Sequence, residues 1–367
     1  MSTLSTKDFN EFESRAKKSE EQIALLETQV QTLQNEMTAL LKNVPYVPEA
    51  KPLSKRPIDI IGARMKHYEE QAYVSRILDN QKPLIVRLDG HCFHTFTKGF
   101  DRPFDYRLHN AMENSKDFSC KKKIKKKITQ VLATADCLTR FNARSGYTQS
   151  DEITLVWDAC DPNVEESSHL FGGRVVKTSS VLAGYVSSRF VHHIKQQMSD
   201  KKWDENNKDL RAKIENCEAH FDGRAFNVPN KEELCENIVW RSHYDCKRNS
   251  ISMLAHAHFS PKQLHNKSCS EMKHMLLEMK KIDWETDTPL AFRFGTVVKK
   301  ELFVKEFMHP ISQQLDTTTR TRIAYTPINT SLEMKDKSTL TQFFLDKYWP
   351  ADFIRKYQDT FVRIELS

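Results

Sequence analysis

Two stretches of the sequence decide the fold, and each joins an apolar run to acidic residues. The first is Leu84-Ile85-Val86-Arg87-Leu88-Asp89-Gly90, and the second is Tyr147-Thr148-Gln149-Ser150-Asp151-Glu152-Ile153-Thr154-Leu155-Val156-Trp157. Both apolar runs have the length and the Val, Ile and Leu content that are typical of β-strands. If the two strands pair in antiparallel fashion, Asp89 at the end of one lies beside Asp151 at the start of the other.

This pairing predicts a magnesium site. Two adjacent carboxylates repel each other unless a cation lies between them. Mg²⁺ suits such a pair because it binds carboxylates together with phosphates and water, and two ions about 4 Å apart can stabilise a phosphoryl displacement. Because successive strand residues point to opposite faces, we assign the ligand role to Asp151. Glu152 is a weaker catalytic candidate, as a supporting residue or a structural anchor. The alternative is that all three are ordinary acidic residues at strand ends.

The flanking residues resemble a known family. Arg87-Leu88-Asp89-Gly90 and Phe93-His94-Thr95-Phe96-Thr97-Lys98-Gly99-Phe100 are similar to the first motif of the tRNA(His) guanylyltransferase superfamily. Ser150-Asp151-Glu152 is similar to its second acidic motif, and the resemblance extends over roughly residues 58–300. It implies an α+β fold, in which an antiparallel, polymerase-like palm sheet carries helices on one face. It also implies an enzyme that adds nucleotides in the reverse direction, to RNA 5′ ends.

The resemblance also implies roles for individual residues. Two Mg²⁺ ions would be held by Asp89, Asp151 and the Gly90 carbonyl. The triphosphates of ATP and GTP would be positioned by His94, Lys98, Ser150, Arg174 and Lys177. The last two open a helix from 171 to about 197, where basic residues oppose the helix dipole unless they face phosphate. Contacts to nucleotide or to the tRNA end are predicted for Lys247, Arg248 and Asn249.

One departure from the family pattern selects a subtype. After Asp245-Cys246, members that modify tRNA(His) have His-Ile-Asn-Asn, whereas this chain has Lys247-Arg248-Asn249-Ser250. The chain therefore resembles the repair-type relatives, and we predict template-guided addition of nucleotides to the 5′ end of tRNA. The first alternative is a tRNA(His) guanylyltransferase that adds a single G. The second is a non-catalytic, coiled-coil RNA-binding scaffold, and a palm-like nucleotide cyclase is more remote.

The N-terminal region has a different pattern. Residues 9–44 carry apolar residues at alternating spacings of three and four, which predicts a coiled coil over 1–44. The alternative is one amphipathic helix that lies on its own domain. Prolines at 45, 48, 52 and 57 predict an extended linker over 45–57. We expect the catalytic domain over 58–300 and a C-terminal extension over 301–367.

Composition limits the class of protein. The chain has 367 residues, of which 39% are hydrophobic and 29% charged, and its net charge is +7. This mild basic excess is compatible with tRNA and nucleoside triphosphates as partners. No apolar run approaches the ~20 residues needed to span a bilayer, and the scattered cysteines indicate reduced thiols. We expect an intracellular protein, in the cytoplasm or alternatively in mitochondria, and the resemblance implies a homo-tetramer.

Two further patterns have a functional and an ordinary interpretation. Residues 121–127 contain six lysines, which is typical of a solvated loop and also suits contact with RNA phosphates. Cys217, His220, His243 and Cys246 have a spacing that could suggest zinc. We expect buried thiols and surface histidines instead, because the order of the four residues is unusual for a zinc site.

Overall fold

The computed structural model describes residues 28, 29, 31, 32, 61–68, 77–100, 102, 103, 105, 129–164, 167–198, 207–308, 314–329 and 337–364. The chain divides into two units, Met1–Ser54 and Lys55–Ser367. The predicted coiled coil lies outside the described residues, except for residues 28, 29, 31 and 32, which are helical. The predicted linker and the lysine-rich run lie outside them entirely. Among the described helices, none is long and apolar enough to cross a membrane.

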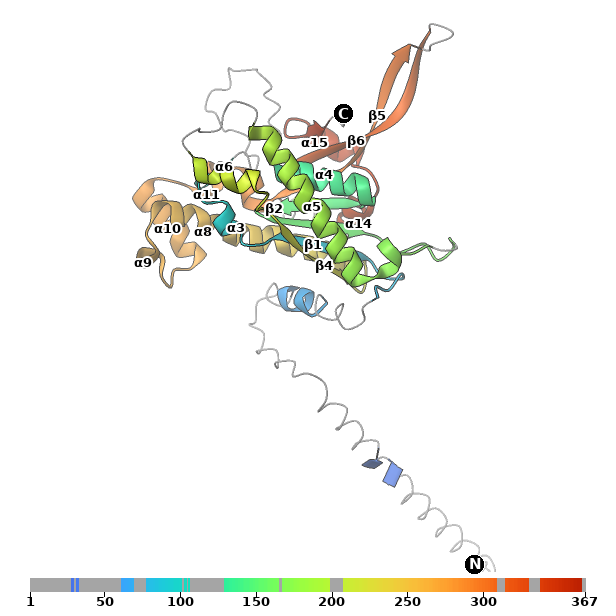
Figure 1. Ribbon diagram of the computed structural model, residues 1–367, viewed down its shortest axis with the longest axis horizontal. Helices are drawn as coiled ribbons and strands as arrows, with labels where there is room; N and C mark the ends of the chain where they lie inside the picture. The colour runs from blue at the N-terminus through green and yellow to red at the C-terminus, as the bar shows by residue number, and fades with distance from the viewer. Residues whose placement is uncertain are drawn as a thin grey trace, which may run out of the picture. The chain divides into compact units, whose positions relative to one another are not determined.

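An antiparallel sheet forms the centre of the second unit (Figure 1). Its seven strands have the order β4-β1-β3-β2-β5-β6-β7, and every neighbouring pair is antiparallel. The strands are β1 (Leu84–Gly90), β2 (Ser145–Gln149), β3 (Glu152–Trp157), β4 (Phe221–Asn227), β5 (Thr296–Met308), β6 (Leu315–Pro327) and β7 (Val362–Ile364). The predicted combination of helices with an antiparallel sheet is confirmed.

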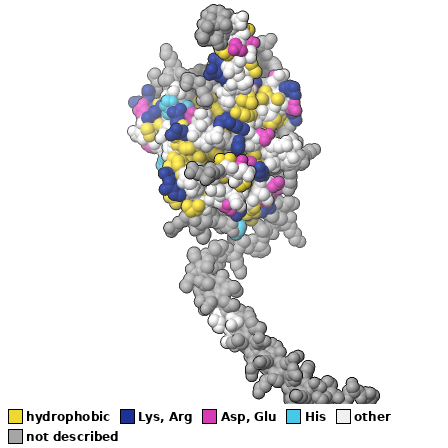
Figure 2. All heavy atoms as spheres, turned by 90° about the vertical axis from the view of Figure 1, so that its right-hand side faces the viewer, with side chains coloured by type: hydrophobic (Ala, Val, Ile, Leu, Met, Phe, Trp, Pro, Cys, Tyr) yellow, Lys and Arg dark blue, Asp and Glu magenta, His cyan; other side chains and the backbone are white. Residues whose placement is uncertain are grey.

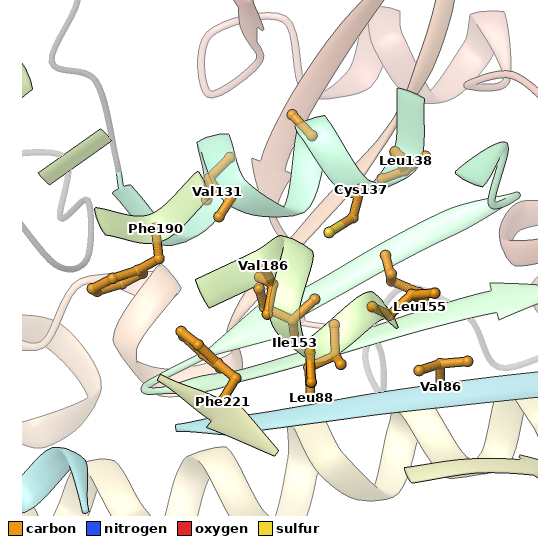
Figure 3. Close-up of a cluster of buried hydrophobic side chains, with 14 of the residues drawn as sticks. Val86, Leu88, Val131, Cys137, Leu138, Ile153, Leu155, Val186, Phe190 and Phe221 are labelled. Carbon is orange, nitrogen blue, oxygen red and sulfur yellow. The ribbon is translucent and has the colours of Figure 1, made fainter. Parts of the chain in front are cut away.

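Two helices cover one face of this sheet. They are α4 (Thr129–Phe141) and α5 (Val175–Met198), which lie side by side over the strands (Figure 1). Figure 3 shows the interface, where Leu88 and Ile153 of the central strands meet Val186 and Phe190 of α5. All four side chains are at most 1% exposed. Close packing of this kind makes the face a dry core.

The other face is also covered, so the expectation of helices on one face only was wrong. There α7 (Lys231–Trp240) and α14 (Lys337–Leu345) pack against Ile85, Tyr147 and Val156. The strand sequences explain this difference. Leu84-Ile85-Val86 is apolar without alternation, which is typical of a strand that is buried on both faces.

A smaller helical core adjoins the sheet. Its members include Ile251, Leu254, Leu276, Trp284 and Phe294. Outside the two covering layers, residues 61–68 are helical, and further helices are α3 (Phe93–Phe96), α6 (Lys208–Glu215), α8 (Lys247–His258), α9 (Pro261–Leu264), α10 (Cys269–Lys280), α11 (Trp284–Asp287), α12 (Leu290–Phe294) and α15 (Ala351–Lys356). A short 3₁₀ turn, η1 (Leu170–Gly173), precedes α5, and a π-helical turn, η2 (Arg241–Cys246), joins α7 to α8.

The C-terminal region belongs to the same sheet, so the predicted boundary at residue 300 falls inside β5. The distal half of the β5–β6 hairpin projects beyond the other strands (Figure 1) and exposes Leu302, Val304 and Leu315. On the face shown in Figure 2, the basic side chains of the described residues are interspersed with acidic and hydrophobic ones. Lys299 of β5 donates to the Phe343 carbonyl and, at 2.6 Å, to the Asp346 carbonyl, which ties β5 to the end of α14.

Two glycines give a matched test of this packing. A Cβ on Gly223 of β4 would lie 2.6 Å from the Ser179 carbonyl oxygen of α5, whereas a Cβ on Gly184 would meet nothing within 4 Å. We expect Gly223→Ala to lower the free energy of unfolding by about 1–3 kcal/mol through overpacking. Gly184→Ala should raise it by up to about 1 kcal/mol, because alanine favours helix. Parallel urea titrations measure both, and a stable Gly223→Ala protein would contradict the close packing of α5 on β4.

Candidate active site

The carboxylates are brought together by the pairing of β1 with β3. Asp89 is opposite Glu152 in this register, and Asp151 immediately precedes Glu152. The Gly90 N–H donates to the Asp151 carbonyl at 3.0 Å, which ties the end of β1 to the β2–β3 turn. Gly90 is required here because a Cβ would lie 2.4 Å from the Phe93 ring. The arrangement agrees with the antiparallel pairing that the sequence indicates.

The β2–β3 turn is tight and strained. Ser150 and Asp151 are its only two residues, since Gln149 and Glu152 on either side already pair with each other. Ser150 has a φ of 46°, in the left-handed region that favours glycine. Such backbone strain occurs preferentially at functional sites. The turn places Asp151 outside the regular strand, so the alternation of strand faces does not fix its direction.

Asp151 is poorly solvated. Burial and, secondly, the nearby Asp89 carboxylate raise the pKa of Asp151 from 3.8 to about 6. Both effects disfavour the charged form, and a cation between the two carboxylates would offset both. The protein's own charges therefore do not stabilise this pair of carboxylates when both are ionised.

This raised pKa predicts a pH-dependent stability. The group binds a proton more tightly in the folded chain, so its stabilising effect is complete below pH 3.8 and is lost as the pH rises through about 6. Such a difference is worth about 3 kcal/mol, at 1.36 kcal/mol for each tenfold change. In EDTA at pH 7, Asp151→Asn should therefore unfold at higher urea than the wild type. That advantage should shrink by about 1 kcal/mol at pH 5, and an advantage independent of pH would contradict the assignment.

Glu152 has a different environment from Asp151. It is 3% exposed, and Arg241 Nε donates to its Oε1 at 2.6 Å while Arg241 Nη2 bonds to its Oε2. Arg241 Nη1 also contacts Asp245 Oδ2 at 2.6 Å. The bidentate pair occupies both oxygens of Glu152. The structural alternative therefore fits Glu152 better than a catalytic role: it is an anchor that binds the sheet to η2.

A pocket of about 260 Å³ adjoins the β2–β3 turn. Three of the residues predicted from sequence line it, namely His94, Ser150 and Asn249. An adjoining hollow is lined by Asp151 and shares His94 and Ser150 with the pocket. The pocket also contains residues that the sequence reasoning missed, including Arg102, Asp105, Gln149, His256 and Phe292. Arg102 and Asp105 directly follow the first motif along the chain, and this closeness could have indicated that they line the pocket.

The structure does not bring Arg174 and Lys177 to this site, so within one chain they do not line the pocket beside Asp151. Arg174 pairs with Ile77, before the start of β1. Phe190, near the other end of α5, packs against Phe93 beside Gly90, with ring centroids 5.4 Å apart. At 1.5 Å per residue, α5 separates these two places by more than about 20 Å. Lys177 instead lies over the Phe171 ring at 5.4 Å.

Three other predicted contacts also lie elsewhere. Lys98 borders a shallow hollow with Asn207 and Lys213. Lys247 lies 5.9 Å from the centre of the Trp284 ring, and Arg248 pairs with Asp245 at 2.8 Å. Neither residue lines the pocket, although the neighbouring Asn249 does. The helical period explains this result, since three successive residues of α8 point in three directions.

No zinc cluster forms at the cysteine and histidine pattern. Across the described part of the chain, no three His, Cys, Asp or Glu side chains are grouped so as to hold a metal. Cys246 is buried and donates to the Phe292 carbonyl, whereas Cys217 is exposed and contacts Lys195. The exposed His220 and the buried Cys246 agree with the expected surface histidines and buried thiols, whereas the exposed Cys217 does not.

Comparisons with known proteins identify the family. The family model described as tRNAHis guanylyltransferase matches residues 62–229, which contain both carboxylates. An uncharacterized protein of Acanthamoeba polyphaga mimivirus is 33% identical over 304 residues, covering 81% of this chain and 93% of the viral protein. The tRNA(His) guanylyltransferase of Schizosaccharomyces pombe is 24% identical over 191 residues, covering 52% of this chain and 58% of the yeast protein.

A solved bacterial tRNA(His) guanylyltransferase-like protein in complex with ATP is 27% identical, with a TM-score of 0.49. The match covers 77% of this chain and 99% of the bacterial one. The sequence matches, together with the two acidic motifs on paired strands, show that the chain belongs to the tRNA(His) guanylyltransferase superfamily of nucleotidyltransferases.

Proposed function

We propose that this chain adds nucleotides to the 5′ end of tRNA, directed by the opposing strand. The observation that carries the proposal is the β1–β3 pairing, which places Asp89 and Asp151 together next to the pocket of His94 and Ser150. Family membership supplies the reaction class, a nucleotidyl transfer. Carboxylates on adjacent antiparallel strands are the arrangement of a polymerase palm, and we assign the central sheet this role.

The donors suit Mg²⁺. Asp89, Asp151 and the Gly90 carbonyl offer only oxygen, which magnesium prefers, and they leave positions for water and substrate phosphates. Burial and, secondly, repulsion by Asp89 raise the pKa of Asp151, and a divalent cation between the two carboxylates would offset both effects. When bound, two ions would lower the pKa of the attacking hydroxyl and stabilise the departing phosphates.

The proposed reaction has two steps. A 5′-monophosphate end is first joined to the α-phosphate of ATP or GTP, and pyrophosphate leaves. The 3′-hydroxyl oxygen of the incoming nucleoside triphosphate then bonds to the 5′ phosphorus, its proton is released, and AMP or GMP leaves. The chain's own contribution is mainly positioning and charge, as in other phosphoryl transfers. His94 and Ser150 would position the triphosphate, and Asn249 would contact the nucleotide from α8.

The repair-type assignment rests on the residues at the start of α8. Lys247-Arg248-Asn249-Ser250 stands where tRNA(His)-modifying members have His-Ile-Asn-Asn. This segment lies beyond residues 62–229, which the family model matches. The alternative within the same superfamily remains a tRNA(His) guanylyltransferase. A tetramer is proposed on the family resemblance alone, and a cytoplasmic location on the scattered cysteines, which indicate reduced thiols.

Substrate choice separates these alternatives. The test compares a tRNA that lacks its first 5′ nucleotide with a tRNA(His) that lacks only its extra G, each with Mg²⁺ and separate nucleotides. Incorporation on several truncated tRNAs supports repair. Incorporation of G on tRNA(His) alone supports the guanylyltransferase. RNA binding without incorporation on either substrate would leave the scaffold as the better account.

A further inference from the structure

A second pocket lies across α12 from the first. Phe292 of this short helix lines the first pocket, which adjoins the β2–β3 turn. The next residue, Arg293, lines a cavity of about 180 Å³ on the other side of the helix. The polar side chains of this second cavity come from α11 to β5, from β6 and from the segment before β7. They are Thr286, Thr288, Arg293, Thr296, Tyr325 and Thr360. We name it the threonine–arginine pocket.

Two polar atoms here have no partner within the described residues. Thr288 is 1% exposed, and its Oγ1 makes no hydrogen bond there. Arg293 Nε is also buried without an acceptor. Buried polar groups are nearly always bonded, so two orphans in one cavity require an explanation.

Arg293 contacts aromatic rings instead of carboxylates. Its guanidinium lies 5.7 Å from the ring centres of both Trp284 and Phe294. The nearby Glu285 is bound to Lys273 at 2.6 Å, and Asp283 accepts from the Glu285 backbone N–H at 2.9 Å. Within the described residues, Arg293 forms no ion pair, and its positive charge is left for a ligand.

The lining selects the chemical class of that ligand. Guanidinium N–H groups and threonine hydroxyls donate, whereas none of the residues that line the cavity is acidic. A cation would therefore find no charged partner, while a phosphate matches the planar fork of arginine. Pro289, Leu290 and Val362 complete the walls with apolar groups, and this strengthens the electrostatic attraction.

We propose that the threonine–arginine pocket binds a phosphate group. Its wall is fixed to the catalytic region, because Tyr147 and Ser242 both donate to the Phe294 carbonyl, at 2.9 and 2.6 Å. Thr296 also pairs with Thr148, two residues before Ser150. The phosphate can belong to an RNA backbone or be free phosphate. The RNA source rests on the proposed function, whereas the pocket's affinity for phosphate does not.

The test uses Thr288→Val and Arg293→Gln, with Arg355→Gln as the matched control. Arg355 is an exposed arginine of α15 and lies outside both pockets. The Tm of each protein is measured against inorganic phosphate in EDTA, at constant ionic strength set with sodium chloride. Since hydrogen bonds to charged groups are strong, both pocket variants should need about tenfold more phosphate for the same rise in Tm. The control should match the wild type.

Thr288→Val also separates binding from folding. Replacing an unpaired buried hydroxyl by a methyl should leave the phosphate-free Tm unchanged or higher, so weaker phosphate binding in this variant cannot be a folding defect. If tRNA affinity falls with phosphate affinity, the ligand is a backbone phosphate. If tRNA affinity is unchanged, the ligand is free phosphate. Equal phosphate responses in the wild type and both pocket variants would overturn the proposal.

Discussion

Asp89→Asn is expected to reduce nucleotide incorporation by about 10³-fold or more while leaving the chain folded. The substitution removes one of the two carboxylates that the β1–β3 pairing places together. Losing one charged group that acts as part of a catalytic unit commonly costs this much. Removing the charge also relieves the repulsion of Asp151, so the free energy of unfolding in EDTA should be unchanged or higher. Single-turnover incorporation and urea titration measure the two effects.

Asp158→Asn is the control for this variant. Asp158 directly follows the far end of β3, where it pairs with Lys231 at 2.7 Å. Asp151 directly precedes β3 and Asp158 directly follows it, so the two carboxylates lie at opposite ends of this strand. Incorporation should be close to wild type in this control, and the wild type in EDTA should behave like Asp89→Asn. Substantial residual incorporation by Asp89→Asn would exclude a two-carboxylate metal site.

Arg241→Met is expected to produce the largest loss of stability, about 3–5 kcal/mol. The substitution leaves the Glu152 carboxylate, whose side chain is 4% exposed, without its cation. Glu152→Gln should cost less, because Arg241 keeps its contact with Asp245 at 2.6 Å. The double variant should be more stable than the sum of the single losses predicts, since it leaves no unpaired charge.

Arg248→Met is the comparison for this pair. Arg248 contacts the same Asp245 at 2.8 Å, but its side chain is 66% exposed, and exposed ion pairs contribute at most about 1 kcal/mol. Urea titration of the two arginine variants should therefore give clearly different midpoints. Equal midpoints would mean that burial of the Glu152–Arg241 pair has no energetic consequence.

The central strands and the pairing of their acidic ends could be predicted from the sequence because the signals are local. Leu84–Gly90 and the run before Trp157 are short, apolar and bounded by turn-forming residues. The positions of His94 and Ser150 follow from their closeness along the chain to the two strand ends. Arg241, in contrast, is 89 residues from Glu152 along the chain. Helix and strand periodicity describe only local neighbours, so they could not predict this contact.

Two other differences have physical causes. The distal half of the β5–β6 hairpin was missed because it is exposed on both faces, so threonines and charges dilute the apolar alternation that marks a strand. Arg174 and Lys177 were misplaced because a motif gives the order of residues but not the direction of a helix. Once α5 crosses the sheet toward Phe93, its first turn must lie at the far end.

The most direct test of the proposed function is template switching on one tRNA. The substrate lacks its first 5′ nucleotide, and the base opposite the gap is changed in turn to each of the four. Each nucleoside triphosphate is then supplied alone with Mg²⁺, and incorporation is measured. If the proposed function is correct, the nucleotide incorporated changes with the opposing base, following Watson–Crick pairing. Incorporation of G whatever the opposing base, or no incorporation on any of the four substrates, would contradict it.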